Sequence, residues 1–346
     1  MTNQRKKPKV LKFLKITAAT LACTFTALIS FMVVVQATRP KNPFIVEKGE
    51  RPLVAAHRGG SLENPENTMR AFRDAVYKYN VDIIETDVYI TKDGHLVCTH
   101  DPYIDEKCNV NGNMPLKEVH RRCSKSENKE LYRHYVADMT LAQLKKYNFG
   151  YFFRDKSGKR LYENVNDIEA EGLQIITLDQ LFAEFRESHP NLLFSVELKN
   201  GGEQGKRACA ALKEVFEKFP EYKNRVLVST FQDAIEAELR FTCPELMRSA
   251  ATASARNFVL SKDFGIDFLY EGDFTCLQVP IFYDTGVAMI QLDNKEFIDK
   301  AHRNNVAVQY WTINKPEEMR KLIEIGCDCI ITDDLELINQ ILKEYE

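Results

Sequence analysis

Short apolar runs alternate with amphipathic segments along most of the chain. Eight of the runs have the length and the β-branched and aromatic content of strands: 53–57, 82–90, 192–198, 225–230, 246–251, the less sharply defined 267–279, 306–313 and 328–332. Segments between them, such as 67–79, 316–325 and 335–343, carry apolar residues at spacings of three and four, which predicts helices. Strands that alternate with helices in this way predict a parallel sheet.

The number of predicted strands favours a closed form of that sheet. Eight strand–helix units are typical of an α/β fold, the (β/α)8 TIM barrel, rather than of an open doubly wound sheet. The sequence contains no GxGxxG or Walker-type loop, which further disfavours a nucleotide-binding fold. The alternation stops at 101–172, a polar stretch rich in Lys, Asn and Tyr. We interpret this stretch as an insertion after the second strand, at the catalytic end of the barrel.

The N-terminal residues differ from the rest in composition. Residues 16–37 are a run of 22 uncharged, mainly apolar residues, and six basic residues precede it. A helix of this length crosses the apolar core of a bilayer, and the preceding positive charge predicts that 1–15 is a basic cytoplasmic tail. We therefore expect a single-pass transmembrane anchor, with the domain formed by residues 43–346 outside the cytoplasm. The alternative is a signal peptide cleaved after 35–37, which would give a secreted protein.

The distribution of charge narrows the class of binding partner. The chain has 47 basic and 50 acidic residues, but residues 1–42 hold eight basic residues and no acidic ones, which leaves 39 against 50 in the remainder. This acidic excess argues against a nucleic-acid partner.

None of the nine cysteines forms a CxxC pair, and we expect mostly buried, reduced thiols. Cys108 and Cys123 are the first pair to test for a disulfide.

Polar side chains gather where the first three strands are predicted to end. They are His57, Arg58, Glu85, Asp87, His100, Glu197 and Lys199. Glu85 and Asp87 share one face of their strand, and a barrel would bring the whole set to its C-terminal mouth. Three inward carboxylates repel one another, and a hard divalent cation, Mg²⁺ or Ca²⁺, resolves that conflict. The two histidines beside them are available as acid and base near neutral pH.

Each of these residues has an ordinary structural interpretation when it is taken alone. An isolated histidine is more often hydrogen-bonded in a core or on a surface than catalytic, and Glu85 with Asp87 could form a solvated strand face. Glu197 followed by Lys199 could be a salt-bridged strand end. The joint occurrence of all of them at predicted ends of consecutive strands favours a functional site.

The motifs that hold these residues resemble those of the glycerophosphodiester phosphodiesterase family. They are His57-Arg58-Gly59, Pro65-Glu66-Asn67-Thr68, Glu85-Thr86-Asp87, Thr91-Lys92-Asp93-Gly94, His100-Asp101, Val196-Glu197-Leu198-Lys199, Trp311-Thr312-Ile313-Asn314 and Ile331-Thr332-Asp333. The resemblance spans about residues 52–340 and is most specific in the first five motifs. It implies a TIM barrel, a divalent metal, and hydrolysis of small glycerophosphodiesters to sn-glycerol 3-phosphate and an alcohol.

The resemblance also implies a role for each site residue. The implied roles are metal ligands for Glu85, Asp87 and Glu197, acid and base for His57 and His100, and substrate binding for Arg58, Lys199 and Trp311. The planar Arg58 guanidinium suits a phosphoryl oxygen, Lys199 adds positive charge, and Trp311 provides an aromatic wall. We take Glu66, Asn67 and Thr68 as structural, with Asn67 as the helix N-cap.

Three functions are compatible with these residues. The leading one is a membrane-anchored, metal-dependent glycerophosphodiester phosphodiesterase. The second is a lysophospholipase D that acts on acylated glycerophosphodiesters and uses the anchor to stay near lipid. The third is a non-catalytic barrel that binds glycerophospho groups as a receptor or scaffold. The third predicts the loss of a histidine or a carboxylate, and none is lost.

Overall fold

A computed structural model describes most of the chain. It covers residues 41–104, 109–110, 134–263, 274–284, 286 and 289–346, together with 17, 20, 23–27 and 30 near the N-terminus. The chain divides into two compact units, 1–42 and 43–346. Among the residues covered, no helix is both long and apolar enough to cross a membrane. Most of the predicted anchor at 16–37 lies outside the described residues, so that anchor stays a prediction.

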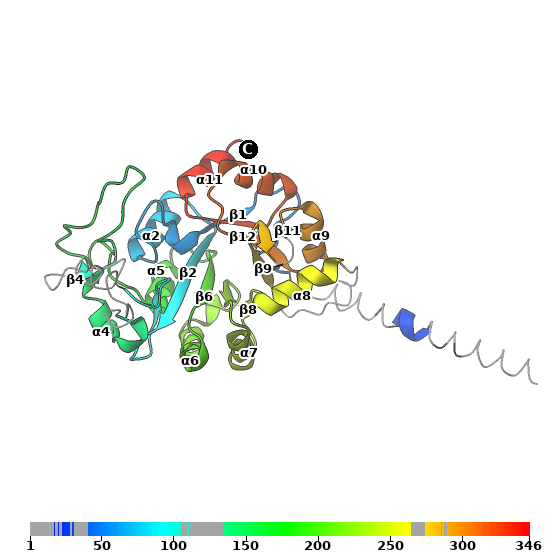
Figure 1. Ribbon diagram of the computed structural model, residues 1–346, viewed down its shortest axis with the longest axis horizontal. Coiled ribbons are helices and arrows are strands. Elements are labelled where there is room, and N and C mark those ends of the chain that lie inside the picture. The colour runs from blue at the N-terminus through cyan, green and yellow to red at the C-terminus, as the bar shows by residue number, and fades with distance from the viewer. Residues whose placement is uncertain are drawn as a thin grey trace, which may run out of the picture. The chain divides into compact units, whose positions relative to one another are not determined.

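Eight parallel strands in the described part of residues 43–346 form a barrel (Figure 1). In chain order they are β1 (Leu53–Ala56), β2 (Ile83–Ile90), β6 (Leu193–Leu198), β7 (Val226–Ser229), β8 (Met247–Arg248), β9 (Cys276–Val279), β12 (Ala307–Tyr310) and β13 (Cys329–Thr332). The sheet runs β8-β7-β6-β2-β1-β13-β12-β9, and one parallel bridge between Ser249 and Cys276 joins its two edges. Each predicted strand run contains one of these strands, so the TIM-barrel prediction is confirmed.

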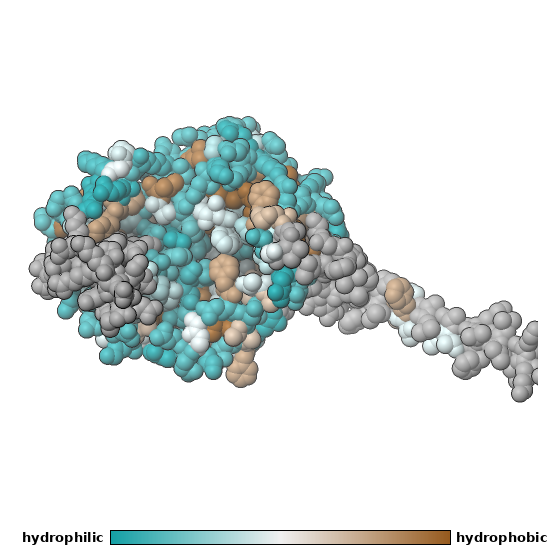
Figure 2. Space-filling view, in the orientation of Figure 1, coloured by the Kyte–Doolittle hydropathy of each residue, from teal (hydrophilic) through white to brown (hydrophobic). Residues whose placement is uncertain are grey.

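Helices surround the barrel on its outer side (Figure 1). They are α2 (Met69–Arg73) with the π-helical turn η2 (Asp74–Lys78), α5 (Leu178–Phe185), α6 (Gly202–Lys218) with the 3-10 turn η5 (Pro220–Tyr222), α7 (Asp233–Thr242), α8 (Thr252–Asp263), α9 (Lys295–Arg303), α10 (Pro316–Ile325) and α11 (Leu335–Leu342). Their apolar stripes face the strands; α10, for example, buries Met319 and Leu322. The visible surface over the helices is mainly hydrophilic (Figure 2).

The start of α2 differs from the sequence prediction by one residue. Thr68, not Asn67, is the N-cap, and its hydroxyl oxygen accepts a hydrogen bond from the Ala71 N–H at 3.3 Å. Asn67 has a left-handed backbone with φ 55°. Its side chain turns inward, where its amide oxygen accepts from the Thr86 hydroxyl at 2.7 Å. The prediction that Asn67 is the N-cap was therefore wrong, because its side chain is hydrogen-bonded to Thr86 of β2 instead.

The interior of the barrel, from Phe44 before the first strand up to the floor of the C-terminal mouth, is filled by apolar side chains. They are Phe44, Ala55, Ile83, Leu227, Cys276, Ala307, Cys329 and Ile331. Phe44, which precedes the first strand, is completely buried, and two residues later the Val46 N–H donates to Asp328 Oδ1 at 2.9 Å. The interior of the barrel is thus a packed core.

Residues 101–172 contribute no barrel strand in their described part. They hold β4 (Asn109–Val110), which pairs with β5 (Tyr147–Asn148), the 3-10 turn η4 (Val136–Asp138) and the short helix α4 (Leu141–Leu144). The Lys156 ammonium lies 2.8 Å from Asp334 Oδ1 and 3.2 Å from Glu63 Oε1, in the loops that follow β13 and β1. Because strands β1 and β13 end at these loops, the contacts place this part of the insertion at the C-terminal end of the barrel.

Two further antiparallel strand pairings occur among the described residues, in addition to the eight parallel strands. Strand β3 (Leu96–Cys98) runs back along β2, and β10 (Phe282–Asp284) pairs with β11 (Met289–Gln291) after β9. The seven cysteines that the structure describes are free thiols, and all but Cys23 are buried. Cys108 and Cys123 lie outside the described residues.

Candidate active site

Strand register brings the predicted site residues to one end of the barrel. Asp87 of β2 pairs with Glu197 of β6, and Ile84 pairs with Ala56, so the next residues, Glu85 and His57, lie at the same level. A cavity of about 300 Å³ opens there. It is lined by His57, Arg58, Glu85, Asp87, His100, Glu197, Lys199, Ser229, Thr230, Phe231, Ser249, Ala250, Gln278, Trp311, Thr312 and Ile331. All eight predicted site residues are among them.

The tight turn η1 (His57–Gly59) after β1 directs the first two site residues into the cavity. Arg58 has a left-handed φ of 53°, and its N–H donates to Glu85 Oε2 at 2.8 Å. Gly60 follows at φ 88°, and a Cβ there would lie 2.6 Å from Leu335 Cδ1. A side chain at position 60 would therefore collide with α11. The hydrogen bond from Arg58 to Glu85 joins the same turn to β2.

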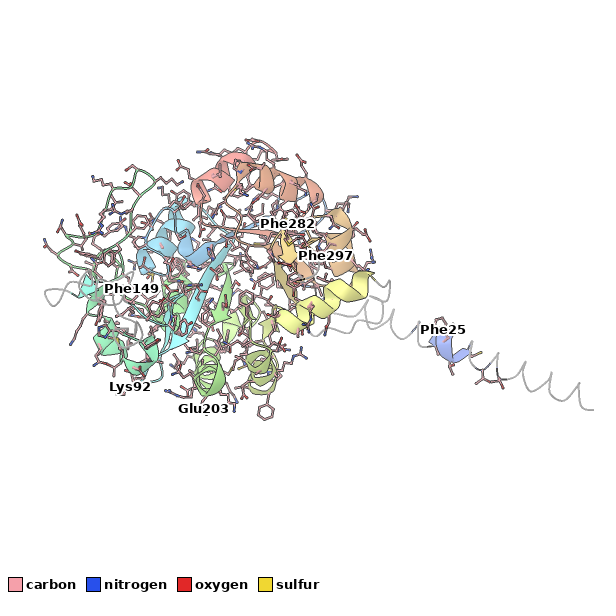
Figure 3. All side chains as sticks on the ribbon, viewed as in Figure 1. Phe25, Lys92, Phe149, Glu203, Phe282 and Phe297 are labelled. Atoms are coloured by element: carbon pink, nitrogen blue, oxygen red, sulfur yellow. The ribbon has the colours of Figure 1, made fainter. Side chains whose placement is uncertain are left out.

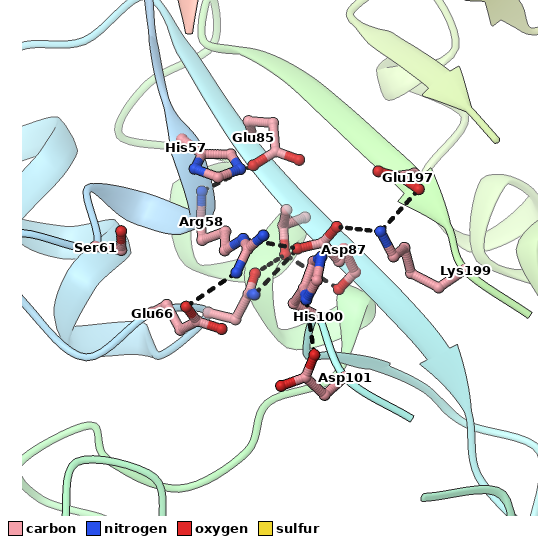
Figure 4. Close-up of polar contacts among 12 residues, drawn as sticks. His57, Arg58, Ser61, Glu66, Glu85, Asp87, His100, Asp101, Glu197 and Lys199 are labelled. Atoms are coloured by element: carbon pink, nitrogen blue, oxygen red, sulfur yellow. Dashed lines mark hydrogen bonds and ion pairs between the residues drawn. The ribbon is translucent and has the colours of Figure 1, made fainter. Parts of the chain in front are cut away.

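Both histidines meet a carboxylate on the same ring nitrogen. His57 Nδ1 lies 2.6 Å from Asp333 Oδ1, and His100 Nδ1 lies 2.9 Å from Asp101 Oδ1 (Figure 4 shows the latter pair). Burial disfavours the charged form of His57, but the hydrogen bond to Asp333 and the nearby Glu85 carboxylate outweigh it, so the pKa of His57 is raised. In each ring the second nitrogen, Nε2, is left for other partners.

The Arg58 side chain lies between two acidic residues (Figure 4). Its Nη1 donates to Glu66 Oε2 at 3.1 Å, and its Nε is 3.5 Å from Asp87 Oδ2. Nε is buried and makes no hydrogen bond to any residue that the structure describes. Nε is thus covered, with the Asp87 carboxylate as its nearest charged partner. Glu66, which the sequence led us to treat as structural, orients this guanidinium.

The three carboxylates carry more negative charge than their surroundings balance. Glu85 is 7% exposed, and its burial, reinforced by the charge of Asp87, raises its pKa to about 8. Burial also raises the pKa of Glu197, against the opposing effect of Lys199. The Lys199 ammonium lies 3.0 Å from Glu197 Oε1 and 3.4 Å from Asp87 Oδ1, between the two side chains (Figure 4).

An all-oxygen donor set of this kind fits a hard divalent cation, since Mg²⁺ and Ca²⁺ prefer carboxylate ligands. The raised pKa of Glu85 follows mainly from burial and from the charge of Asp87, and a cation bound beside these carboxylates would oppose both effects. Within the described residues, however, no three His, Cys, Asp or Glu side chains are so grouped that they could hold an ion as they stand. The donors thus have the chemistry for a cation but are not grouped around one, and the Lys199 ammonium lies between Asp87 and Glu197.

The remaining wall of the cavity is uncharged. It comes from the strands and loops of β7 to β13, whereas the charged residues come from β1, β2, β6 and the segment after β3. The Phe231 and Trp311 rings meet edge to face, 5.6 Å apart at 66°. Phe231 is 51% exposed. The cavity thus has a charged half and an uncharged half that holds two aromatic rings.

Sequence reasoning missed several residues of this site. Asp333 lies in a recognised motif, yet no role followed from it; in the structure it binds His57 together with Ser61 and Asn314. Its position directly after the last strand, where polar residues point into barrel mouths, was the available signal. Phe231 likewise follows β7, but nothing in the sequence distinguished it from a core aromatic residue.

Comparison with known proteins agrees with this geometry. Residues 57–337 match the glycerophosphoryl diester phosphodiesterase family. The chain belongs to this family. A glycerophosphodiester phosphodiesterase of Caldanaerobacter subterraneus is 28% identical over 299 residues, which cover 85% of this chain and 99% of the relative. The prediction of an enzyme of this class is confirmed.

Solved structures of the family share the fold. The glycerophosphoryl diester phosphodiesterase domain of a Mycobacterium tuberculosis protein superposes with a TM-score of 0.63 at 16% identity, covering 84% of this chain and 99% of that one. An Oleispira antarctica phosphodiesterase, solved with the product sn-glycerol-3-phosphate, gives 0.58 at 19% identity over 85% and 97% of the two chains. At these identities the likeness concerns the barrel alone.

Proposed function

We propose that this enzyme hydrolyses glycerophosphodiesters to sn-glycerol 3-phosphate and an alcohol, with a divalent cation held by Glu85, Asp87 and Glu197. The observation that carries the proposal is the single cavity in which these carboxylates meet two histidines and two basic side chains. The product bound to the Oleispira antarctica relative supports the same substrate class. When bound, Mg²⁺ or Ca²⁺ would neutralise charge on the phosphoryl oxygens.

The basic side chains bind and orient the phosphate in this proposal. Arg58 offers its guanidinium at the cavity wall, and Lys199 offers an ammonium that now lies between Asp87 and Glu197. Both favour the extra negative charge that develops on phosphorus-bound oxygen in the transition state. Phe231 and Trp311 receive the alcohol portion, because they lie in the uncharged half of the cavity.

His57 and His100 move the protons. One accepts the proton of the glycerol 2-hydroxyl as its oxygen bonds to phosphorus, and the other donates a proton to the departing alkoxide as its P–O bond breaks. Water then opens the cyclic phosphate with the two roles reversed. The Nδ1 atoms are held by Asp333 and Asp101, so Nε2 is the working atom of each ring.

Kinetics on the purified full chain in detergent test this proposal. We expect turnover of glycerophosphocholine, glycerophosphoethanolamine or glycerophosphoinositol that disappears on chelation and returns with Mg²⁺ or Ca²⁺. His57→Ala and His100→Ala should each lose on the order of 10²–10⁴ in rate, the usual scale for lost acid–base catalysis. A p-nitrophenyl leaving group, which needs no protonation, should rescue only the variant that lacks the acid. Normal turnover in both histidine variants would exclude this mechanism.

A second candidate, lysophospholipase D activity, is favoured by exposed apolar side chains near the mouth. Phe282 and Met289, on the β10–β11 pair that follows β9, are 51% and 61% exposed, and Phe231 lies at the cavity. An acyl chain could lie against such residues. Lysophosphatidylcholine offered in the same assay separates the two candidates: a higher kcat/KM than for glycerophosphocholine would make the acylated diester the substrate.

We also propose that residues 16–37 anchor the enzyme in a membrane, with the catalytic domain outside the cytoplasm. The supporting features are the uncharged run and the six basic residues before it. Protease added to intact cells should degrade the domain. A mature protein that begins near Thr38 would instead identify a cleaved signal peptide.

A further inference from the structure

Asp333, the first residue after β13, joins the turn after β1 to the loop after β12. Its Oδ1 lies 2.6 Å from His57 Nδ1 and accepts a hydrogen bond from the Ser61 hydroxyl at 2.6 Å. Its Oδ2 accepts from Asn314 Nδ2 at 2.7 Å. We propose that Asp333 is a positioning residue: it keeps the proton on His57 Nδ1 and directs Nε2 into the cavity. This inference rests on the proposed role of His57 in proton transfer.

The surrounding network requires a carboxylate at position 333. The Asn314 amide has one possible orientation, because its oxygen accepts from the Asp333 N–H at 2.9 Å and from the Thr332 hydroxyl at 3.0 Å. Its NH₂ group must therefore face Asp333 Oδ2. An asparagine at 333 would turn its own NH₂ either toward this donor or toward His57 and Ser61. Turned toward Asn314, this NH₂ would meet a second donor; turned toward His57, it would make Nδ1 the acceptor and move the ring proton to Nε2. Only a carboxylate therefore accepts on both sides and keeps the proton on Nδ1.

The same contacts determine the tautomer of His57. Burial favours the protonated acid, but hydrogen bonds from His57, Ser61 and Asn314 outweigh it and lower the pKa of Asp333 to about 2. An ionised carboxylate can only accept, so the proton between Asp333 and His57 belongs to Nδ1. In the neutral ring Nε2 then has a free lone pair, and in the charged ring it carries the transferable proton. Either state suits an acid or a base that works at Nε2.

The adjacent residue, Asp334, provides a matched control. It caps α11 by accepting from the Leu337 N–H at 2.9 Å, and its Oδ1 also binds the Lys156 ammonium at 2.8 Å. It contacts neither histidine in any described hydrogen bond or ion pair. Two neighbouring aspartates thus have separate tasks, one at the cavity and one at a helix end. Asp333→Asn and Asp334→Asn make the same chemical change at these two places.

Kinetics of the full chain in detergent give the first test. Asp333→Asn should lower kcat at least tenfold with KM nearly unchanged, but by no more than the loss in His57→Ala, on the order of 10²–10⁴. Asp334→Asn should keep kcat, even where its melting temperature falls. The double variant His57→Ala/Asp333→Asn should be no slower than His57→Ala, because both changes act on one proton-transfer unit. Normal kcat in folded Asp333→Asn, or losses that multiply in the double variant, would overturn the proposal.

Histidine-selective ¹⁵N NMR gives a second test that needs no activity. The wild-type enzyme should show a low-field Nδ1–H proton that is absent from His57→Ala and from Asp333→Asn but present in Asp334→Asn. A wild-type ring protonated only at Nε2 would contradict the proposal even in an active enzyme. If the wild type hydrolysed no glycerophosphodiester, the proposed function would fail while this spectrum still reported on Asp333.

Should Asp333→Asn not fold, Asn314→Ala is the second variant. It removes the donor at Oδ2 and leaves the contact between His57 and Asp333 in place, so the carboxylate is free to rotate. We expect kcat to fall at least threefold while the Nδ1–H signal persists. An unchanged kcat in this variant would overturn the proposal.

Discussion

Replacing Glu85 by Gln should stabilise the enzyme when no divalent cation is present. Burial and the charge of Asp87 raise the pKa of Glu85 from 4.5 to about 8. The folded state therefore holds this proton more tightly than the unfolded chain does. The contribution of Glu85 to the free energy of unfolding is therefore most favourable below about pH 4.5, and it is lost as the pH rises from there to about 8. Glutamine carries no charge at any pH and avoids this loss.

The size of the effect follows from the two pKa values. At pH 7 the pH exceeds the unfolded pKa by about 2.5 units, and each unit corresponds to about 1.4 kcal/mol, so the buried charge costs roughly 3 kcal/mol. Above pH 8 the cost levels off at roughly 5 kcal/mol, and at pH 5 it is below about 1 kcal/mol. Glutamine keeps an oxygen to accept from the Arg58 N–H, a bond of 2.8 Å in the wild type. Little packing is lost in the exchange, since the two side chains have nearly the same shape.

Denaturant unfolding of the full chain in chelator, at pH 5, 7 and 8.5, measures this cost. Glu85→Gln should match the wild type at pH 5 and exceed it by roughly 3 kcal/mol at pH 7. Glu203→Gln, on the outer side of α6 (Figure 3), is the matched control and should change nothing, because its side chain is 82% exposed. With Mg²⁺ or Ca²⁺ the order should reverse, since only the wild type gains a ligand. Equal stability at pH 7 in chelator would refute the reasoning.

Three further substitutions test the framework around the site. Thr68→Ala removes the cap that accepts from the Ala71 N–H and should cost about 1 kcal/mol in thermal unfolding while kcat is kept. Gly60→Ala forces a side chain into a left-handed position against Leu335 and should cost about 1–3 kcal/mol; an undiminished melting temperature would show that the turn can relax. Phe44→Ala empties a fully buried site at the N-terminal end of the barrel and should cost about 3–5 kcal/mol by denaturant unfolding, with KM unaltered.

The sequence predicted those parts of the fold that depend on local pattern. Every predicted strand run contains a barrel strand, and the helix predicted at 316–325 has the same limits in the structure. Seven of the eight site residues could also be found from position, because each lies on or shortly after a strand that leads to the mouth, whereas Trp311 followed only from the family resemblance. The hydrophobic period of a segment, and the position of a residue along a strand, depend on residues that are neighbours in the sequence. They can therefore be predicted without a structure.

Features that depend on distant contacts could not be predicted in this way. Asn67 and Thr68 are equally good caps by residue type, and only the approach of Thr86 on β2 decides between them. The partner of His57 lies 276 positions away, at Asp333. Neither spacing nor composition reports on such a pair until the barrel closes.

The barrel is held together unevenly around its circumference. Strands β2 and β6 pair along six residues, whereas among the described residues a single bridge, between Ser249 directly after β8 and Cys276 of β9, joins β8 to β9. Amide hydrogens beside this seam should therefore exchange with solvent sooner than those of β2, because fewer bonds need to break. Ser249 and Ala250 also line the uncharged half of the cavity, while Asp87 and Glu197 lie on the extensively paired strands β2 and β6. Local opening at the seam can widen the space for a departing alcohol and leave the acidic side chains in place.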